Sequence, residues 1–222
     1  MHHEGPKAND LENVRALNEA FLTMLRRSPH ARKHLFGLRS DVARQLIELT
    51  PRRAARLAEV PFLLFSFRER DETFWRPAFD VDTTQDLFST THQRHGDVSR
   101  LIDAGLGFIW QLAKQNPYVL RILCGASVHW CEQVAEHPLI QILNFASSNH
   151  EMLVIRLERK TEVWLKLLDA GVSDLREVRR AAHISALQTI LTNTEDATST
   201  AWASAACRTQ IPILQLADKN AN

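Results

Sequence analysis

Helical spacing of apolar residues is the feature that most constrains what this chain can fold into. Near the N-terminus, apolar side chains recur with helical spacing, at Leu11, Val14, Leu17, Phe21, Leu22, Met24 and Leu25. This spacing places them on one face of an α-helix. Only seven glycines occur in 222 residues, and the β-branched residues form no alternating runs. Together these features predict an all-α fold.

Residues that start and end helices divide the chain further. Asp10 is a suitable N-cap for the first helix, which Ser28-Pro29 ends. Thr50 followed by Pro51 is typical of a helix start, with a capping hydroxyl and a proline in the first turn. In the second half we expect helices over residues 85–115, 117–136, 138–147, 149–170 and 174–192, and a further one near 195–210. The run Phe62–Phe67 is too short and too apolar for its periodicity to separate helix from strand.

The acidic and polar segment Asp80–Thr84 is the expected boundary between two parts of the chain. No internal repeat and no low-complexity tract is recognised. Apolar residues make up 45 % of the chain, which is enough for a substantial core. The expected organisation is a disordered tail over 1–9, a helical module over 10–80, a helical bundle over 84–210 and a second tail over 211–222.

Composition argues against secreted and membrane-spanning classes. The three cysteines, Cys124, Cys131 and Cys207, are odd in number and lack a framework spacing, so a disulfide-stapled domain is not expected. No apolar run reaches the ~18 residues that a membrane span needs. The first six residues contain no apolar core of a signal peptide. We therefore expect a cytoplasmic protein of bacterial style that does not contact a membrane.

Positive charge is concentrated in residues 26–56. This segment holds nine basic and two acidic side chains, a net charge of +7, whereas the whole chain has a net charge of +1. The basic residues are Arg26, Arg27, Arg32, Lys33, Arg39, Arg44, Arg52, Arg53 and Arg56. Such a charge division on a helical segment suggests a partner that carries negative charge.

The same region carries a family resemblance. In order, the matching pieces are Leu17-Asn18, Phe21-Leu22, Leu35-Phe36-Gly37-Leu38, Leu49-Thr50, Leu57-Ala58-Glu59, Leu63-Leu64 and Phe67-Arg68. The stretch Leu17–Arg68, about a quarter of the chain, thereby resembles the D subunit of the bacterial flagellar master transcriptional regulator, the FlhD family.

The resemblance implies a small all-α dimer without enzymatic activity. Members of that family pair with a zinc-containing C subunit and bind promoter DNA as a hetero-oligomer, so it implies a homodimer, a protein partner subunit and DNA. Two departures are visible. The family's dimer-linking cysteine aligns with Phe65, and this chain is longer by roughly 140 residues that lack the C subunit's four clustered cysteines.

Residues 41–58 have the pattern of a helix-turn-helix, with a turn at Leu49-Thr50-Pro51. Arginines at the start of the second helix suit contacts with phosphates and with guanine edges. A threonine hydroxyl and helix amides also suit a phosphate. The candidate nucleic-acid-binding residues are Arg44, Thr50, Arg52, Arg53 and Arg56.

Other interpretations of the basic segment stay open. It could be a solvated arginine-rich face whose aliphatic stems cover apolar surface. It could also meet an acidic protein, in which case the chain would be a helical adaptor or oligomerisation protein with no DNA contact. The expected helix over 174–192 has a basic first half as well, with Arg176, Arg179 and Arg180, but Asp174 and Glu177 dilute its charge.

Catalytic and metal-binding patterns are weak. His92 and His95 have the spacing of two metal ligands on a helix, but no second ligand pair is evident. Cys124 and Cys131 lack a neighbouring base and fit a helical core. Gly105-Leu106-Gly107 is half of a dinucleotide fingerprint, and it fits close helix packing better. We therefore expect no cofactor, no metal and no enzymatic activity. An enzyme would need convergent carboxylate, histidine or metal groups in one pocket.

Overall fold

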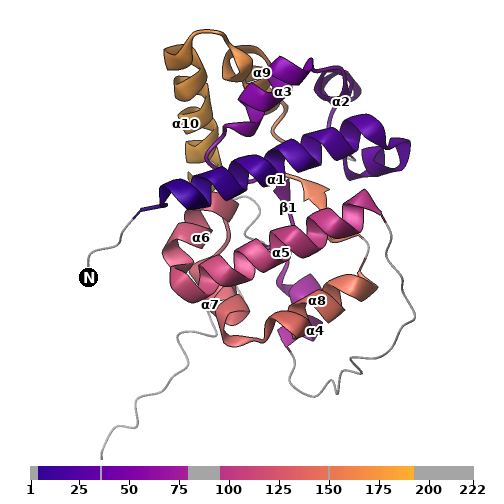
Figure 1. The fold of residues 1–222 in the computed structure, drawn as a ribbon, viewed down its shortest axis with the longest axis vertical. Helices are drawn as coiled ribbons and strands as arrows, with labels where there is room; N and C mark the ends of the chain where they lie inside the picture. The colour runs from indigo at the N-terminus through magenta and orange to yellow at the C-terminus, as the bar shows by residue number, and fades with distance from the viewer. Residues whose placement is uncertain (1–4, 36, 80–95, 150, 193–222) are drawn as a thin grey trace, which may run out of the picture.

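The computed structural model describes residues 5–35, 37–79, 96–149 and 151–192 (Figure 1). It confirms the all-α class, with one two-stranded sheet as the exception. The first half contains α1 (Ala8–Arg27), the 3-10 helix η1 (Pro29–Leu35), α2 (Ser40–Ile47), α3 (Pro51–Ala58), β1 (Phe65–Ser66) and α4 (Glu72–Phe79). The second contains α5 (Asp97–Gln115), α6 (Pro117–Cys124), α7 (Val128–Glu136), α8 (Leu139–Ser148), β2 (Val154–Ile155), α9 (Thr161–Asp169), the 3-10 helix η2 (Ala170–Val172) and α10 (Arg176–Thr192).

The expected starts of α1 and α3 have different outcomes. Helix α1 begins before Asp10, whose carboxylate accepts a hydrogen bond from the Lys7 backbone N–H (2.9 Å) and so satisfies a donor at the helix start. Thr50 caps α3 as expected. Its hydroxyl oxygen accepts from the Arg53 backbone N–H (3.4 Å), and Pro51 occupies the first helical position.

Two expected helices of the second half are wrong. Residues 117–136 form two helices, because Gly125 takes a left-handed conformation (φ 64°) and the Ser127 hydroxyl then caps α7 by accepting from the Trp130 N–H (3.1 Å). Residues 149–170 contain β2 before α9 begins. The expected boundary at 80–84, residues 85–95 and the helix near 195–210 lie outside the described residues.

Strands β1 and β2 join the two halves of the chain. They are antiparallel, with Phe65 opposite Ile155 and Ser66 opposite Val154. Each strand is only two residues long, and each follows a short helix, α3 or α8. This pairing across 89 residues is what decides that the Phe62–Phe67 run contains a strand.

An internal structural repeat, which the sequence patterns do not reveal, organises the molecule. The order α1-η1-α2-α3-β1-α4 is repeated as α5-α6-α7-α8-β2-α9. Pro29 and Pro117 each begin the second element of their repeat, 88 residues apart. Gly37 and Gly125, also 88 residues apart, both have a positive φ. The sequence patterns show no repeat because equivalent positions mostly carry different residue types.

The repeat continues through the strands with a separation of 89 residues. Arg68 and Leu157 have nearly the same left-handed φ, 60° and 56°. The indole N–H of Trp75 donates to the Phe67 carbonyl, and that of Trp164 donates to the Arg156 carbonyl, both at 2.9 Å. Both tryptophan side chains are fully buried. The two segments thus share backbone conformation, burial and hydrogen bonding, although their residue types mostly differ.

A pseudo-two-fold axis relates the repeats and passes between β1 and β2. With the 89-residue offset, Phe65 corresponds to Val154 and Ser66 to Ile155. Phe65 therefore pairs with Ile155, the counterpart of Ser66, and Ser66 pairs with Val154, the counterpart of Phe65. Such reciprocal pairing is typical of a two-fold interface. Helices α1 and α5, which open the two repeats, lie side by side across the middle of the molecule (Figure 1).

The two repeats are intertwined. Trp75 of α4 contacts Trp130 of α7 and Phe145 of α8, with ring centroids 5.3 and 5.4 Å apart. Reciprocally, α9 packs against α2. The Leu63 N–H also crosses to donate to the Leu123 carbonyl (3.1 Å). Buried apolar residues of both repeats form one core, so neither repeat has a complete core of its own.

Close approach at this core explains Gly105 of α5. A Cβ at this position would lie 2.6 Å from the Cζ of Phe67, closer than van der Waals contact allows. Glycine is needed at this position for helix α5 to pass Phe67, as the packing interpretation predicts for Gly105. The interpretation does not hold for Gly107, where a Cβ would meet nothing within 4 Å.

Two buried histidines predict that the free energy of unfolding falls on acidification. His34 donates from Nδ1 to the Leu153 carbonyl (2.7 Å), and His183 from Nε2 to the Gly171 carbonyl (2.8 Å). Burial lowers the pKa of both below the ordinary value of 6.5. As the pH falls, these histidines therefore bind protons at a higher pH in the unfolded chain than in the folded chain. The stabilisation is fully present above pH 6.5 and is lost as pH falls from 6.5 toward the folded-state pKa values.

Urea denaturation at about pH 7.5 and about pH 5 tests this expectation. The wild-type chain should be less stable at the lower pH. His34→Gln keeps an N–H donor for Leu153 but cannot titrate, so it should show a smaller difference between the two pH values. Equal stability of the wild-type chain at both values would contradict the prediction.

Candidate nucleic-acid interface

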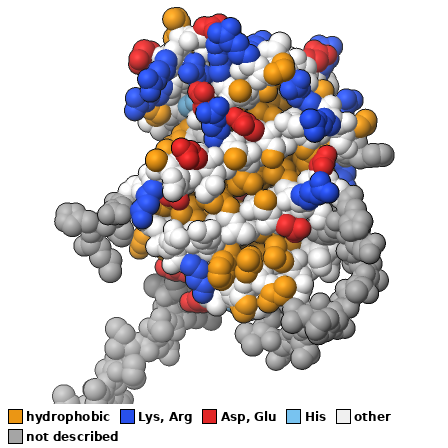
Figure 2. Space-filling view, viewed as in Figure 1, with side chains coloured by type: hydrophobic (Ala, Val, Ile, Leu, Met, Phe, Trp, Pro, Cys, Tyr) orange, Lys and Arg blue, Asp and Glu red, His pale blue; other side chains and the backbone are white. Residues whose placement is uncertain are grey.

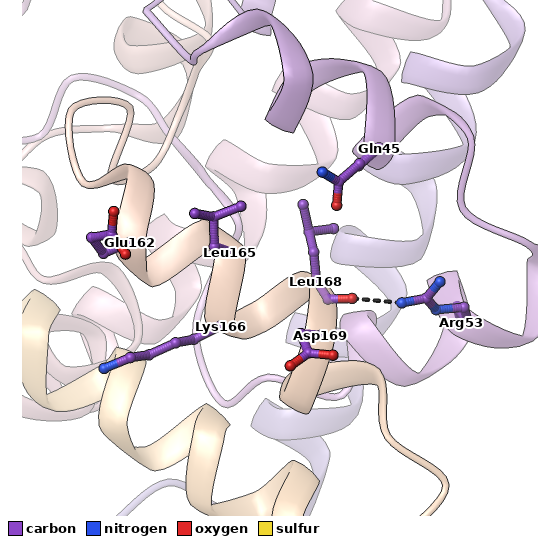
Figure 3. A pocket seen from close by; sticks show the side chains of 7 residues that line it. All are labelled: Gln45, Arg53, Glu162, Leu165, Lys166, Leu168 and Asp169. Atoms are coloured by element: carbon purple, nitrogen blue, oxygen red, sulfur yellow. Dashed lines mark hydrogen bonds between the residues drawn. The ribbon is translucent and has the colours of Figure 1, made fainter.

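The arginines of α3 point toward the end of α9 and toward η2. The Arg53 guanidinium donates from Nη2 to the Leu168 carbonyl (2.6 Å), as Figure 3 shows. Arg56 donates from Nη1 to the Val172 carbonyl (3.2 Å). Carbonyls at the C-terminal end of a helix carry partial negative charge, so guanidinium groups stabilise them. These two contacts hold the α9–η2 corner against α3.

A carboxylate of the second half neutralises part of the same helix. Asp174, just before α10, accepts hydrogen bonds from Arg56 and from Nη2 of Arg52 (3.0 Å). The Arg56 guanidinium, followed by that of Arg52, lowers the pKa of Asp174. Arg56 is only 15 % exposed, whereas Arg52 is 77 % exposed. Arg179 of α10 adds an ion pair to Glu59 (2.9 Å), just after α3.

The predicted set therefore divides between two environments. Arg53 and Arg56 are engaged by their own chain, and Arg52 shares Asp174 at the surface. The Thr50 hydroxyl caps α3. Arg44 is exposed on α2. The predicted contact of these five residues with nucleic acid stays a prediction. Arg44, Arg52 and Arg53 are exposed, and of these Arg53 is bound to the Leu168 carbonyl and Arg52 to Asp174.

Other exposed basic residues lie close to Arg44 in the chain. The end of α1, η1 and α2 carry what we call the basic cluster: Arg26, Arg27, Arg32, Lys33 and Arg44. Within the described residues none of these five makes an ion pair, whereas Arg39 is bound by Asp41 (2.6 Å) and lowers the pKa of that carboxyl to about 2. Figure 2 shows Lys and Arg side chains gathered over the upper part of the molecule, where α2, α3, α9 and α10 lie, with acidic side chains among them.

Two shallow hollows flank α3. Their volumes are about 360 and 460 Å³, and both are lined by Arg53 and Asp169. The first also contains Glu162 and Lys166 (Figure 3), and the second contains Arg56 and Asp174. Both hollows are open to solvent, and both are lined by acidic and basic side chains. In the second hollow the Arg56–Asp174 ion pair joins α3 to the segment before α10.

The cysteines described here do not form a reactive site. Cys124 and Cys131 are buried, free thiols. Burial raises the pKa of Cys124 well above its usual value and that of Cys131 to about 12, which disfavours the thiolate that a nucleophile requires. Cys207, His92 and His95 lie outside the described residues.

Within the described ranges, no group of three or more His, Cys, Asp or Glu side chains is placed to hold a metal ion. No described helix combines the length and the apolar character needed to cross a bilayer.

The partners of the α3 arginines could not be found from local sequence. Asp174 lies 122 residues beyond Arg52, and the Leu168 and Val172 acceptors are backbone carbonyls, which leave no trace in composition. The sequence indicates Asp174 only as an acidic residue that reduces the positive charge of the expected helix over 174–192.

Comparison of the chain with protein-family models, with curated proteins and with solved structures gives no significant match.

Proposed function

We propose that this protein is a DNA-associated regulatory protein of FlhD-like architecture that acts with a protein partner. The observation that carries the proposal is the position of the pseudo-two-fold axis. It passes beside Phe65, which aligns with the cysteine that links the two chains of a FlhD-family dimer. A single chain here supplies the two-fold arrangement that the family builds from two chains, and this supports a resemblance extending beyond Leu17–Arg68.

The duplication changes what is expected of the oligomeric state. The resemblance alone implies a homodimer, but β1 already pairs with β2 of the same chain. The surface that a FlhD-like chain would offer to a second copy is therefore buried within one molecule. We propose that one chain takes the place of a dimer and that its partner is a different protein.

The DNA contact is assigned to the basic cluster rather than to the inward face of α3. The five side chains of the basic cluster are exposed and free of ion pairs within the described ranges, so phosphates can approach them without displacing a carboxylate. Arginine and lysine contacts to phosphate give affinity that is independent of sequence and strongly dependent on salt. The chain's small net charge of +1 makes a second contributor to the DNA contact useful, which favours a partner protein.

Salt-titrated binding of duplex DNA, followed by fluorescence anisotropy, tests the assignment. From about 50 to about 200 mM salt the wild-type chain should lose affinity steeply. The variant Arg32→Ala/Lys33→Ala/Arg44→Ala should lower the slope of log K against log salt by about 2 to 3, since each lost phosphate contact removes about 0.9. Arg100→Ala is the matched control, because Arg100 of α5 is 81 % exposed but lies outside the cluster.

A non-enzymatic adaptor without DNA contact is the second candidate. It is favoured by the hydrogen bonds of Arg53 and Arg56 to the α9–η2 corner. Because of these bonds, the two guanidinium groups are not available to contact bases in a helix-turn-helix. Binding that is absent, insensitive to salt, or equal in the triple variant and the Arg100→Ala control would support the adaptor and reject the DNA proposal.

A further inference from the structure

The two repeats share an order of elements but not a charge. Residues 26–56, from the end of α1 through most of α3, have a net charge of +7. The equivalent residues 114–144 lie 88 positions later and contain two basic and two acidic side chains, so they carry no net charge. The charged residues of this second stretch are Lys114, Arg121, Glu132 and Glu136. The pseudo-symmetric backbone therefore carries a charge distribution that lacks two-fold symmetry.

The basic cluster is not reproduced in the second repeat. At the 88-residue offset its five positions hold Lys114, Gln115, Leu120, Arg121 and Glu132. Leu120 is fully buried, whereas the equivalent Arg32 is exposed. Glu132 places an exposed carboxylate at the position equivalent to Arg44. Figure 2 shows fewer Lys and Arg side chains over the lower part of the molecule, where α7 and α8 lie, than over the upper part.

The two cations that remain at these positions of the second repeat have surroundings that disfavour phosphate. The Lys114 ammonium lies over the Trp110 ring, 5.5 Å from its centroid, in a cation–π contact. Arg121 is on α6, which packs against α7, and α7 exposes Glu132 and Glu136. Charges interact over about 10 Å at 0.1 M salt, so these carboxylates repel a polyanion that approaches α6 and α7. The second repeat therefore offers phosphate a weaker surface than the first.

We propose that DNA contacts the first repeat alone, so that one chain binds one duplex through a single surface. A symmetric dimer presents two equivalent surfaces, which suit a palindromic site with two half-sites about one helical turn apart. This chain has the backbone of such a dimer but only one surface of the required charge. The DNA that it fits therefore has one contact region and no second half-site for the same chain. This proposal rests on the proposed function for the existence of the DNA contact and specifies which repeat makes it.

Two matched pairs of substitutions test the proposal on the full chain. Arg26→Ala/Lys33→Ala and Lys114→Ala/Arg121→Ala each remove two exposed cations, and the four residues occupy equivalent positions in the two repeats. The probe is a labelled duplex of about 20 base pairs, long enough for two half-sites one helical turn apart. The first pair should lower the slope of log K against log salt by about 1.8, since each phosphate contact contributes about 0.9. The second pair should leave the slope unchanged.

An exchange of charge between the repeats separates the position of the charge from its total. The variant Arg44→Glu/Glu132→Arg keeps the net charge of the chain but moves one cation from the first repeat to the equivalent position of the second. Its salt slope should fall by at least about 0.9, because one phosphate contact is lost. If both repeats touched DNA equally, the exchange would leave affinity and slope unchanged.

Three results would overturn the proposal while leaving DNA binding itself supported. They are an equal loss of slope in the two alanine pairs, an unchanged affinity in the exchange variant, and a stoichiometry of two duplexes per wild-type chain. Absence of salt-dependent binding by the wild-type chain would reject the proposed function and this proposal with it. The two failures are therefore distinguishable.

Discussion

Replacing Arg156 by methionine should lower the free energy of unfolding by about 3–5 kcal/mol, because it leaves Glu69 as a buried charge without its partner. The Arg156 side chain is 8 % exposed and that of Glu69 is 1 % exposed, and they are joined by a 2.8 Å ion pair. The Arg156 guanidinium also donates to the carbonyls of Leu63 and Phe65, both at 2.8 Å, and to that of Cys124. One side chain from the second repeat thus satisfies acceptors on both sides of the pseudo-two-fold axis.

The double variant Arg156→Met/Glu69→Met separates the ion pair from the carbonyl contacts. Removing both charges should recover part of the lost stability, but the double variant should remain about 1–3 kcal/mol below the wild-type chain because buried carbonyls lose their donor. Arg15→Met is the control, since the Arg15–Glu19 pair is 50 % and 45 % exposed and should contribute less than about 1 kcal/mol. Urea denaturation measures all three, and a loss in Arg156→Met no larger than in Arg15→Met would reject this role.

The sequence predicted those elements whose start or end depends on residues only a few positions apart. The Thr50-Pro51 start of α3 depends on a hydroxyl three residues from the amide that it caps, so composition and spacing suffice. The division of 117–136 had a comparable signal in Gly125 and Ser127, a C-cap followed by an N-cap, which the continuous apolar pattern on both sides obscured. Such interruptions are detectable when single glycines inside a helical pattern are weighed.

Long-range features had no such signal. Strand β2 is two residues long and exists because β1 offers it a partner 89 residues earlier. The repeat is carried by backbone conformation and burial rather than by residue identity: Arg156 of the second repeat corresponds to Phe67 of the first, and Ile140 corresponds to Arg52. The candidate site was predicted as a set of basic residues, but the division between inward and outward arginines depends on Asp174 and the α9–η2 corner.

The two repeats differ in surface charge, although they share the same order of elements. A homodimer presents each surface twice. In this chain the repeat-one helix α3 has three arginines and the repeat-two helix α8 has none. The two repeats therefore share a backbone architecture, while their corresponding helices differ in charge.

Truncation of Trp75 to alanine should lower the free energy of unfolding by about 3–5 kcal/mol, the range for a large aromatic residue removed from a core. Trp75 is fully buried, stacks on Phe79 with centroids 5.6 Å apart, and meets Trp130 edge to face. Through these contacts α4 of the first repeat closes the core of the second. The loss should appear as a lower urea midpoint with the slope unchanged, because the compactness of the unfolded chain is not altered.

The smaller changes Trp75→Phe and Trp164→Phe test the pseudo-symmetry. Each keeps a ring but removes the indole N–H that donates to the Phe67 or Arg156 carbonyl, so each should lower stability by about 1–3 kcal/mol. Because the two bonds have the same length and the same eight-residue spacing, the two losses should be similar in size, both within the range of about 1–3 kcal/mol. Trp110→Phe is the comparison, since its indole donates to the His137 carbonyl from a half-buried position and should have a smaller effect. A large loss at Trp75 with none at Trp164 would mean that the two sites are alike in geometry but not in energetic role.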